Sequence, residues 1–226
     1  MRQGGPALDI GCGRGRVALA LAAAGLSVTA LDTSYAATSR LSAHLAGLPE
    51  LAARIEVLRQ DVHDTPPVGG GYATAVLGDT SVNMFADGRA LTGFLHRVRP
   101  LLAPDGVFCC AVVQETALSA YAGRSGVVAT DFTDDRGRRQ LLFAAVCFEP
   151  AGPYFSRTLF LPDGTREGGE PVAHLAAVRE PLWTAGALTP HVHEAGFQVT
   201  ERIAAVARND GQGRVDTEIL VLAPDT

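Results

Sequence analysis

The chain has 226 residues, of which 47% are hydrophobic and 19% are charged. This composition is that of a globular protein, and the length allows one domain or one domain with a large insertion, so intrinsic disorder and two large independent domains are excluded. With 19 basic and 24 acidic side chains, the net charge of −5 gives no overall attraction to nucleic-acid phosphates. No apolar stretch approaches the ~18 residues of a membrane span. Neither nucleic acid nor membrane is therefore an expected partner.

The cysteines show no spacing typical of a metal site. Cys12, Cys109, Cys110 and Cys147 form no C-x-x-C pair, and we expect reduced core residues that bind no metal ion. No secretory apolar segment precedes the first glycine-rich motif. Reduced thiols are typical of a reducing compartment, so the sequence predicts a cytoplasmic protein.

The first half of the chain alternates short apolar runs with helical patterns. This alternation is typical of a parallel sheet with crossover helices. The expected strands cover residues 7–10, 26–31, 55–58, 73–77 and 107–113. The expected helices cover 16–24, 34–46 and 90–102.

From residue 114 the pattern changes to strand-like runs separated by turn residues. The expected strands are 127–133, 140–148, 154–161 and 172–178, followed by a short helix starting at Thr189 and Pro190 and by closing strands at 197–207 and 215–223. The chain thus divides into a cofactor-binding half at 1–113, an antiparallel insertion at 114–185 and a C-terminal helix and hairpin at 186–226. The insertion is expected to form a substrate lid or a dimer contact.

The strongest motif is the glycine-rich turn after the first strand. It reads acid-x-Gly-x-Gly-x-Gly from Asp9 to Gly15. Glycines remove Cβ atoms, so backbone N–H groups and the next helix N-terminus can approach a ligand closely. The dinucleotide fingerprint G-x-G-x-x-G fails, because Arg16 stands where its third glycine would be.

This motif resembles motif I of the class I S-adenosylmethionine-dependent methyltransferases, and two more acids stand where that family has them. Asp32 closes the second strand, and the resemblance implies that its carboxylate accepts both ribose hydroxyls. Asp61 follows the third strand, where the resemblance implies contact with the adenine amino group, with a backbone contact from Val62. The resemblance continues through the turn at 102–106 and the segment 194–197, and covers about two-thirds of the chain.

The resemblance implies an α/β fold of Rossmann-like, seven-stranded type. Its mostly parallel sheet would have one antiparallel strand, helices on both faces and an antiparallel insertion after the fifth strand. The implied cofactor is S-adenosyl-L-methionine, bound along the carboxyl edge of the sheet. The implied cofactor-binding residues are Asp9, Gly11, Cys12, Gly13, Gly15, Arg16, Asp32, Thr33, Asp61, Val62 and Gly78.

The insertion and the segment 81–85 resemble small-molecule N-methyltransferases of natural-product biosynthesis, including aminosugar N,N-dimethyltransferases and daptide-type peptide methyltransferases. The resemblance implies a small-molecule or peptide amine as acceptor and a possible homodimer. Candidate catalytic residues are Asp79, Asn83, Glu115 and His174, and candidate substrate-binding residues are Met84, Phe85, Tyr121, Tyr154 and Trp183. Each of these could instead be a cap, loop or packing residue.

Other interpretations stay open. The chain could be an O-methyltransferase acting on a hydroxylated metabolite, or a non-catalytic partner subunit with a methyltransferase fold. A dehydrogenase is the weakest option, because the dinucleotide fingerprint fails. Members of the resembled family carry helices before the first strand, whereas six residues precede Ala7. Either the insertion and a partner subunit cover the cofactor, or residues are missing from the chain.

Overall fold

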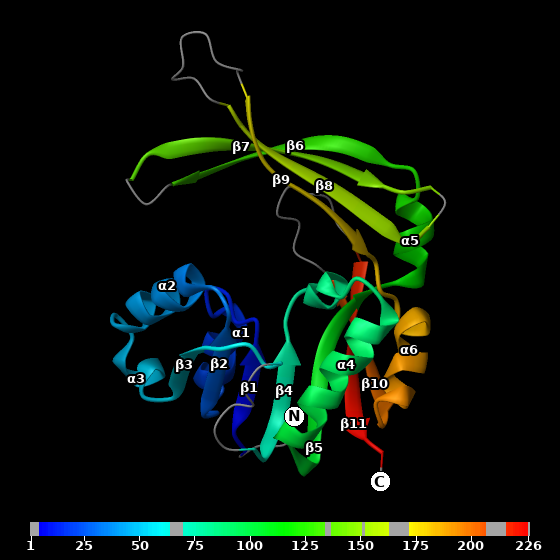
Figure 1. Ribbon diagram of the computed structural model, residues 1–226. Helices are drawn as coiled ribbons and strands as arrows, with labels where there is room; N and C mark the ends of the chain where they lie inside the picture. The colour runs from blue at the N-terminus through cyan, green and yellow to red at the C-terminus, as the bar shows by residue number, and fades with distance from the viewer. Residues whose placement is uncertain are drawn as a thin grey trace.

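The computed structural model describes residues 5–63, 70–133, 137–150, 152–162, 172–206 and 216–225. Within these residues the strands form a seven-stranded sheet of order β10-β11-β5-β4-β1-β2-β3 and a four-stranded sheet of order β6-β7-β8-β9. The smaller sheet lies across the upper end of the larger one, and helices cover the larger sheet (Figure 1). None of the described helices is both long and apolar enough to cross a bilayer.

The larger sheet has the predicted alternation of strands and helices. Its strands are β1 (Ala7–Ile10), β2 (Val28–Asp32), β3 (Ile55–Arg59), β4 (Tyr72–Leu77), β5 (Leu102–Val113), β10 (Phe197–Val206) and β11 (Asp216–Pro224). Strands β1 to β5 pair in parallel, whereas β11 pairs antiparallel with both β5 and β10. One antiparallel strand in a mostly parallel sheet is the predicted arrangement, and the predicted fold class is confirmed.

Two buried hydrophobic clusters separate the strands from the helices. The helices are α1 (Arg16–Ala23), α2 (Tyr35–Leu45), α3 (Pro49–Ala52), α4 (Gly88–Val98), α5 (Glu115–Tyr121) and α6 (Ala185–Glu194), with 3-10 turns η1 (Ser81–Met84) and η2 (Arg99–Leu101). Leu8 belongs to the cluster that contains Phe94 of α4 and Leu188 of α6, whereas its neighbour Ala7 belongs to the cluster containing Leu41 of α2. Successive side chains of β1 therefore lie on opposite faces of the larger sheet. Each fully buried leucine or phenylalanine contributes about 1.5–3 kcal/mol.

The smaller sheet is the expected insertion after β5. Its antiparallel strands are β6 (Ser125–Thr133), β7 (Arg139–Phe148), β8 (Tyr154–Pro162) and β9 (Val172–Pro181). A third apolar cluster joins it to the larger sheet: Phe148 and Phe155, which are register partners, pack with Val113 at the end of β5. The sheet face that carries these two phenylalanines is therefore the one turned toward the carboxyl edge of β5.

Several predicted boundaries are wrong. The helix predicted at 90–102 ends at Val98. Strand β5 begins at Leu102 rather than at 107, because Gly106 lets the backbone come close to β4. A Cβ on Gly106 would lie 2.5 Å from the carbonyl oxygen of Tyr72. Helix α5 was not predicted. Helix α6 begins at 185 rather than 189–190, because the hydroxyl of Thr184 accepts the N–H of Ala187 and caps it there. The predicted turns near 134–136, 163–164 and 209–211 lie outside the described residues.

Candidate active site

The glycine-rich turn joins β1 to α1. Gly11, Gly13 and Gly15 all have positive φ angles, of 65°, 55° and 85°. A Cβ on Gly15 would lie 2.3 Å from Cδ1 of Leu41, whereas a Cβ on Gly13 would have no neighbour within 4 Å. Gly15 thus allows α1 to pack against α2, and Gly13 leaves backbone accessible at the carboxyl edge of the sheet.

Asp9 is buried beneath this turn, with 1% of its surface exposed. Its Oδ2 accepts the N–H of Ala18 at 2.9 Å, and so caps α1, whose N-cap residue Gly15 has no side chain to do so. Burial is the main cause that raises the pKa of Asp9 to about 6, although the bond to Ala18 and the charge of Arg16 oppose it.

Cys12 is buried in the same turn. Burial, followed by the negative charges of Asp9 and Asp32, raises the pKa of its thiol to about 12. The thiol is therefore protonated at neutral pH, and its place in the turn is that of a small apolar side chain rather than a nucleophile.

Asp32 connects the glycine turn with the start of α2. Its Oδ2 accepts the N–H of Gly13 at 2.8 Å, and its Oδ1 accepts the N–H of Ser34, also at 2.8 Å. Thr33, between them in sequence, is exposed. Each carboxylate oxygen can accept a second hydrogen bond, so this arrangement leaves acceptor capacity for a ligand hydroxyl.

Asp61 lies two residues after the end of β3, whereas Asp32 is the last residue of β2 and is the register partner of Arg59. The Oδ1 of Asp61 accepts the N–H of His63 at 2.9 Å in a tight turn, while the neighbouring Val62 is buried in the core. Since β3, β2, β1 and β4 are adjacent in the sheet, the turn and the two acids lie along one edge. This is the edge at which open α/β sheets bind ligands.

Asp79 follows Gly78 at the end of β4 and forms an ion pair with Arg16, the first residue of α1. Its φ of 51° makes it the one non-glycine residue with positive φ within the described residues. A Cβ on Gly78 would lie 3.1 Å from Cγ2 of Val17, so the chain after β4 runs close against the first turn of α1. A strained, charged residue beside a glycine turn is typical of a ligand site.

Asn83 is buried rather than free to act on an acceptor. Its Oδ1 accepts the backbone N–H of Trp183 at 3.0 Å, and the indole Nε1–H of Trp183 donates to the carbonyl oxygen of Phe85 at 3.1 Å. These residues, predicted as catalytic or substrate-binding, connect the end of the insertion to the segment after β4. Met84, between Asn83 and Phe85, is 76% exposed.

Glu115 and Tyr121 lie at the two ends of α5. The Oε1 of Glu115 accepts the N–H of Gly186 at 3.3 Å, in the first turn of α6. The ring of Tyr121 stacks on that of Phe148, with centroids 5.1 Å apart. Tyr121 therefore packs at the join between the two sheets, whereas Glu115 connects α5 to the start of α6.

Tyr154 and His174 belong to the smaller sheet. Tyr154 precedes Phe155 in β8, so its side chain lies on the face opposite the one that packs against β5. The guanidinium of Arg179 lies 3.7 Å from the centroid of the Tyr154 ring and also binds Glu149. The backbone of His174 pairs with Phe160, and its side chain lies outside the described residues.

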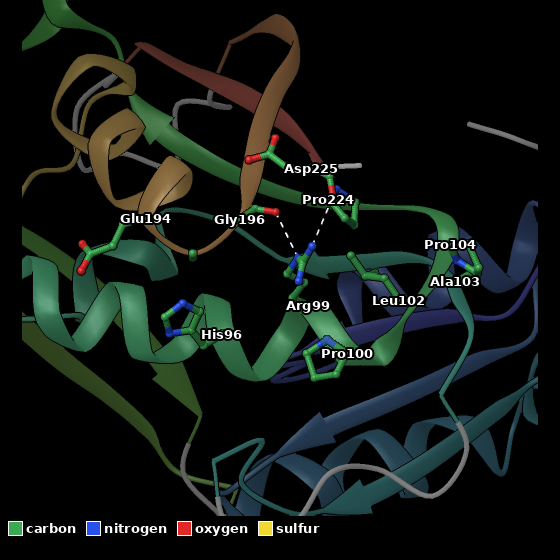
Figure 2. A pocket seen from close by; sticks show the side chains of 11 residues that line it. His96, Arg99, Pro100, Leu102, Ala103, Pro104, Glu194, Gly196, Pro224 and Asp225 are labelled. Carbon is green, nitrogen blue, oxygen red and sulfur yellow. Dashed lines mark hydrogen bonds between the residues drawn. The ribbon is translucent and has the colours of Figure 1, made fainter.

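A cavity of about 540 Å³ lies at the opposite end of the larger sheet, between the C-terminal ends of α4 and α6 and the end of β11 (Figure 2). Within it, the guanidinium of Arg99 donates to the carbonyl oxygens of Gly196 at 3.1 Å and Asp225 at 3.2 Å. These bonds join the C-terminal strand to α4 and satisfy exposed carbonyls. The cavity shares no residue with the glycine turn or its acids.

A sheet of this order, with a glycine turn after β1 and acids at the end of β2 and just after β3, defines a Rossmann-like methyltransferase fold. Residues 7–106 match the family described as "Methyltransferase domain". The chain therefore contains a methyltransferase domain, as predicted from the motif. The comparison with curated proteins finds no match.

Solved structures share this fold over nearly the whole chain. The methyltransferase CcbJ from Streptomyces caelestis has a TM-score of 0.75 at 19% identity, covering 99% of this chain and 85% of its own. The glycopeptide N-methyltransferase MtfA complexed with S-adenosylmethionine has a TM-score of 0.66 at 19% identity, covering 99% of this chain and 89% of its own. The sugar N-methyltransferase KedS8 from Streptoalloteichus sp. ATCC 53650 has a TM-score of 0.64 at 17% identity, covering 97% of this chain and 81% of its own.

Proposed function

We propose that the enzyme methylates an amine of a small-molecule or peptide natural product. The observation that carries the proposal is the exposed carboxylate of Asp79, which stands beside the glycine turn at the end of β4. A carboxylate attracts an ammonium group and can accept its proton, which leaves the nitrogen lone pair free to attack. The fold shared with MtfA and KedS8, whose acceptors are described as a glycopeptide and a sugar, supports the same class of acceptor.

The residues of this chain would mainly position the two reactants. The cofactor in our proposal is S-adenosylmethionine, which when bound supplies an activated methyl group on a sulfonium centre. In our proposal the turn from Gly11 to Gly15 holds its amino-acid part, Asp32 its ribose, and Asp61 with Val62 its adenine. Because the sulfonium is already a good leaving group, alignment and exclusion of water account for most of the acceleration, and alignment alone can contribute about 7–11 kcal/mol.

The cofactor assignment of individual residues is tested by calorimetry with S-adenosylhomocysteine. We expect Asp32→Ala to lose most of the binding, because it removes the predicted diol acceptor and the bond that holds the N–H of Gly13. Tyr72→Phe is a matched control, since it removes a hydrogen bond to Thr29 between the strands of the same sheet and leaves the carboxyl edge intact. Equal affinity in the Asp32 variant and the unaltered enzyme would refute the assignment.

The acceptor class is tested by incubating the enzyme and S-adenosylmethionine with matched acceptors. An aminosugar and its hydroxyl analogue form one pair, and a peptide with a free or an acetylated N-terminus forms the other. Mass spectrometry detects the added methyl group on the acceptor. We expect methylation of the amine in at least one pair and of neither blocked analogue. Methylation of the hydroxyl analogue would instead support O-methylation, and methylation of the acetylated peptide would show that its N-terminal amine is not the acceptor.

We also propose that the smaller sheet covers the acceptor and takes part in a homodimer. The link from Asn83 to Trp183 supports the first role. Strand β6 supports the second, because it is an edge of the sheet and its Val127 is 69% exposed. Light scattering should give the mass of two chains. A single-chain mass that persists at high concentration would refute the dimer.

The four cysteines are free thiols. They support our further proposal that the enzyme works in the cytoplasm, where thiols stay reduced. Fractionation of the producing cell tests it. Recovery of the protein from an oxidising compartment would refute it.

A further inference from the structure

The ion pair between Arg16 and Asp79 spans two neighbouring parts of the site. Arg16 begins α1 directly after the glycine turn, and Asp79 follows β4, whose Leu77 is the register partner of Ile10 in β1. The two side chains remain 68% and 79% exposed. Such an exposed pair adds little to stability, so a ligand can displace one partner at small cost.

The other ionisable groups along this edge carry both signs of charge. Asp9 lies beneath the turn, Asp32 ends β2 and Asp61 follows β3. The cations are Arg14, inside the turn, and Arg59, whose Nε donates to the carbonyl oxygen of Thr33. The cofactor brings two positive groups, a sulfonium and an ammonium, and one negative group, its carboxylate. The cofactor carboxylate needs a cation. Arg16 is the best placed of the three guanidinium groups, because it directly follows the glycine turn and already binds a carboxylate, that of Asp79.

We propose that Arg16 exchanges carboxylates when the cofactor binds. In the free enzyme it pairs with Asp79, and in the complex it pairs with the cofactor carboxylate, which releases Asp79 to receive the acceptor ammonium. The exchange makes cofactor binding precede acceptor binding. This inference rests on the proposed function, because it assigns the amino-acid part of the cofactor to the glycine turn and the acceptor amine to Asp79.

The experiment separates the carboxylate from the rest of the ligand by using three probes in calorimetry. S-Adenosylhomocysteine is the complete ligand, its analogue without the α-amino group keeps only the carboxylate, and 5′-methylthioadenosine lacks both groups. The variants are Arg16→Gln, Asp79→Asn and Arg14→Gln. The last is a matched control that removes the same charge two residues earlier, inside the glycine turn.

For the analogue with only the carboxylate, we expect Arg16→Gln to weaken binding about ten-fold or more, the loss of a charged hydrogen bond. Asp79→Asn should tighten it about two- to five-fold, because the competing exposed pair is removed. Neither variant should change binding of 5′-methylthioadenosine. Arg14→Gln should have a smaller effect than Arg16→Gln on every probe.

Three results would overturn the exchange. The first is an equal loss of all probes in Arg16→Gln, which would show a structural role in the turn. The second is unchanged or weaker binding of the carboxylate analogue in Asp79→Asn. The third is that Arg14→Gln, rather than Arg16→Gln, discriminates between the probes. Failure of the unaltered enzyme to bind S-adenosylhomocysteine would instead contradict the proposed function itself.

Discussion

The buried carboxyl of Asp9 makes a stability prediction that depends on pH. Its pKa rises from the ordinary 3.8 to about 6 in the folded protein, chiefly through burial. One pKa unit corresponds to about 1.4 kcal/mol, so the folded state favours the protonated form by about 3 kcal/mol relative to the unfolded chain. This contribution is fully present below pH 4, where both states are protonated, and it is lost as the pH rises through about 6.

The variant Asp9→Asn removes this titration while keeping an oxygen that can accept the N–H of Ala18. Between pH 4.5 and 7.5, the lost contribution amounts to about 2 kcal/mol when the two pKa values are 3.8 and about 6. The free energy of unfolding of the variant, minus that of the unaltered protein, should therefore increase by about 2 kcal/mol over this range. Any penalty for burying the amide NH₂ group shifts the difference by a constant and leaves its slope unaffected.

Urea unfolding at several pH values measures this difference without a ligand. All other acids titrate in both proteins and cancel in the subtraction. Parallel stability profiles for the two proteins would refute the reasoning, because they would show that Asp9 titrates alike in the folded and unfolded states. A difference that decreases with pH would mean that the folded protein stabilises the charged form.

Two further predictions concern packing. Gly15→Ala should destabilise the protein by about 2 kcal/mol or more, measured by urea unfolding, because its Cβ would lie 2.3 Å from Leu41. Gly13→Ala should lower the free energy of unfolding by only about 1 kcal/mol, because a Cβ there would have no neighbour within 4 Å. Equal losses would contradict the steric argument. Asn83→Ala should destabilise by about 1–3 kcal/mol, because it leaves the buried N–H of Trp183 without its acceptor. A variant with unchanged thermal stability but abolished methyl transfer would show that Asn83 is instead a catalytic residue.

Local sequence patterns were enough to predict most of the larger sheet. Strand β1 is apolar except for Asp9 and leads into a glycine turn. Gly25, with a φ of 93°, ends the following helix as the pattern indicates. The missed boundaries have identifiable causes. Pro190 looked like the first residue of a helix, yet it lies inside α6, because Thr184 provides an earlier cap. Helix α5 follows β5 without a side-chain cap, so its start has no N-cap signal.

The sequence predicted where the acids stand but could not predict most of their contacts. Asn83 and Trp183 are 100 residues apart in sequence, and nothing near either residue indicates that they form a hydrogen bond. In the smaller sheet, most side chains of β8 are half-buried on both faces. Hydrophobic alternation therefore does not reveal which face is turned toward β5, and the side on which Tyr154 lies could be established only from the contacts of Phe155.

The two ends of the larger sheet differ in what they contribute to folding. At the amino end, Arg99 satisfies two carbonyl oxygens and joins the C-terminal strand to α4, which stabilises the fold. The carboxyl end instead contains features that oppose folding: a buried carboxyl at Asp9 and a left-handed backbone at Asp79. A sequence selected for stability alone would avoid both. Their position beside the glycine turn is consistent with a site whose charge and shape serve the cofactor and acceptor, at a cost that the rest of the core offsets.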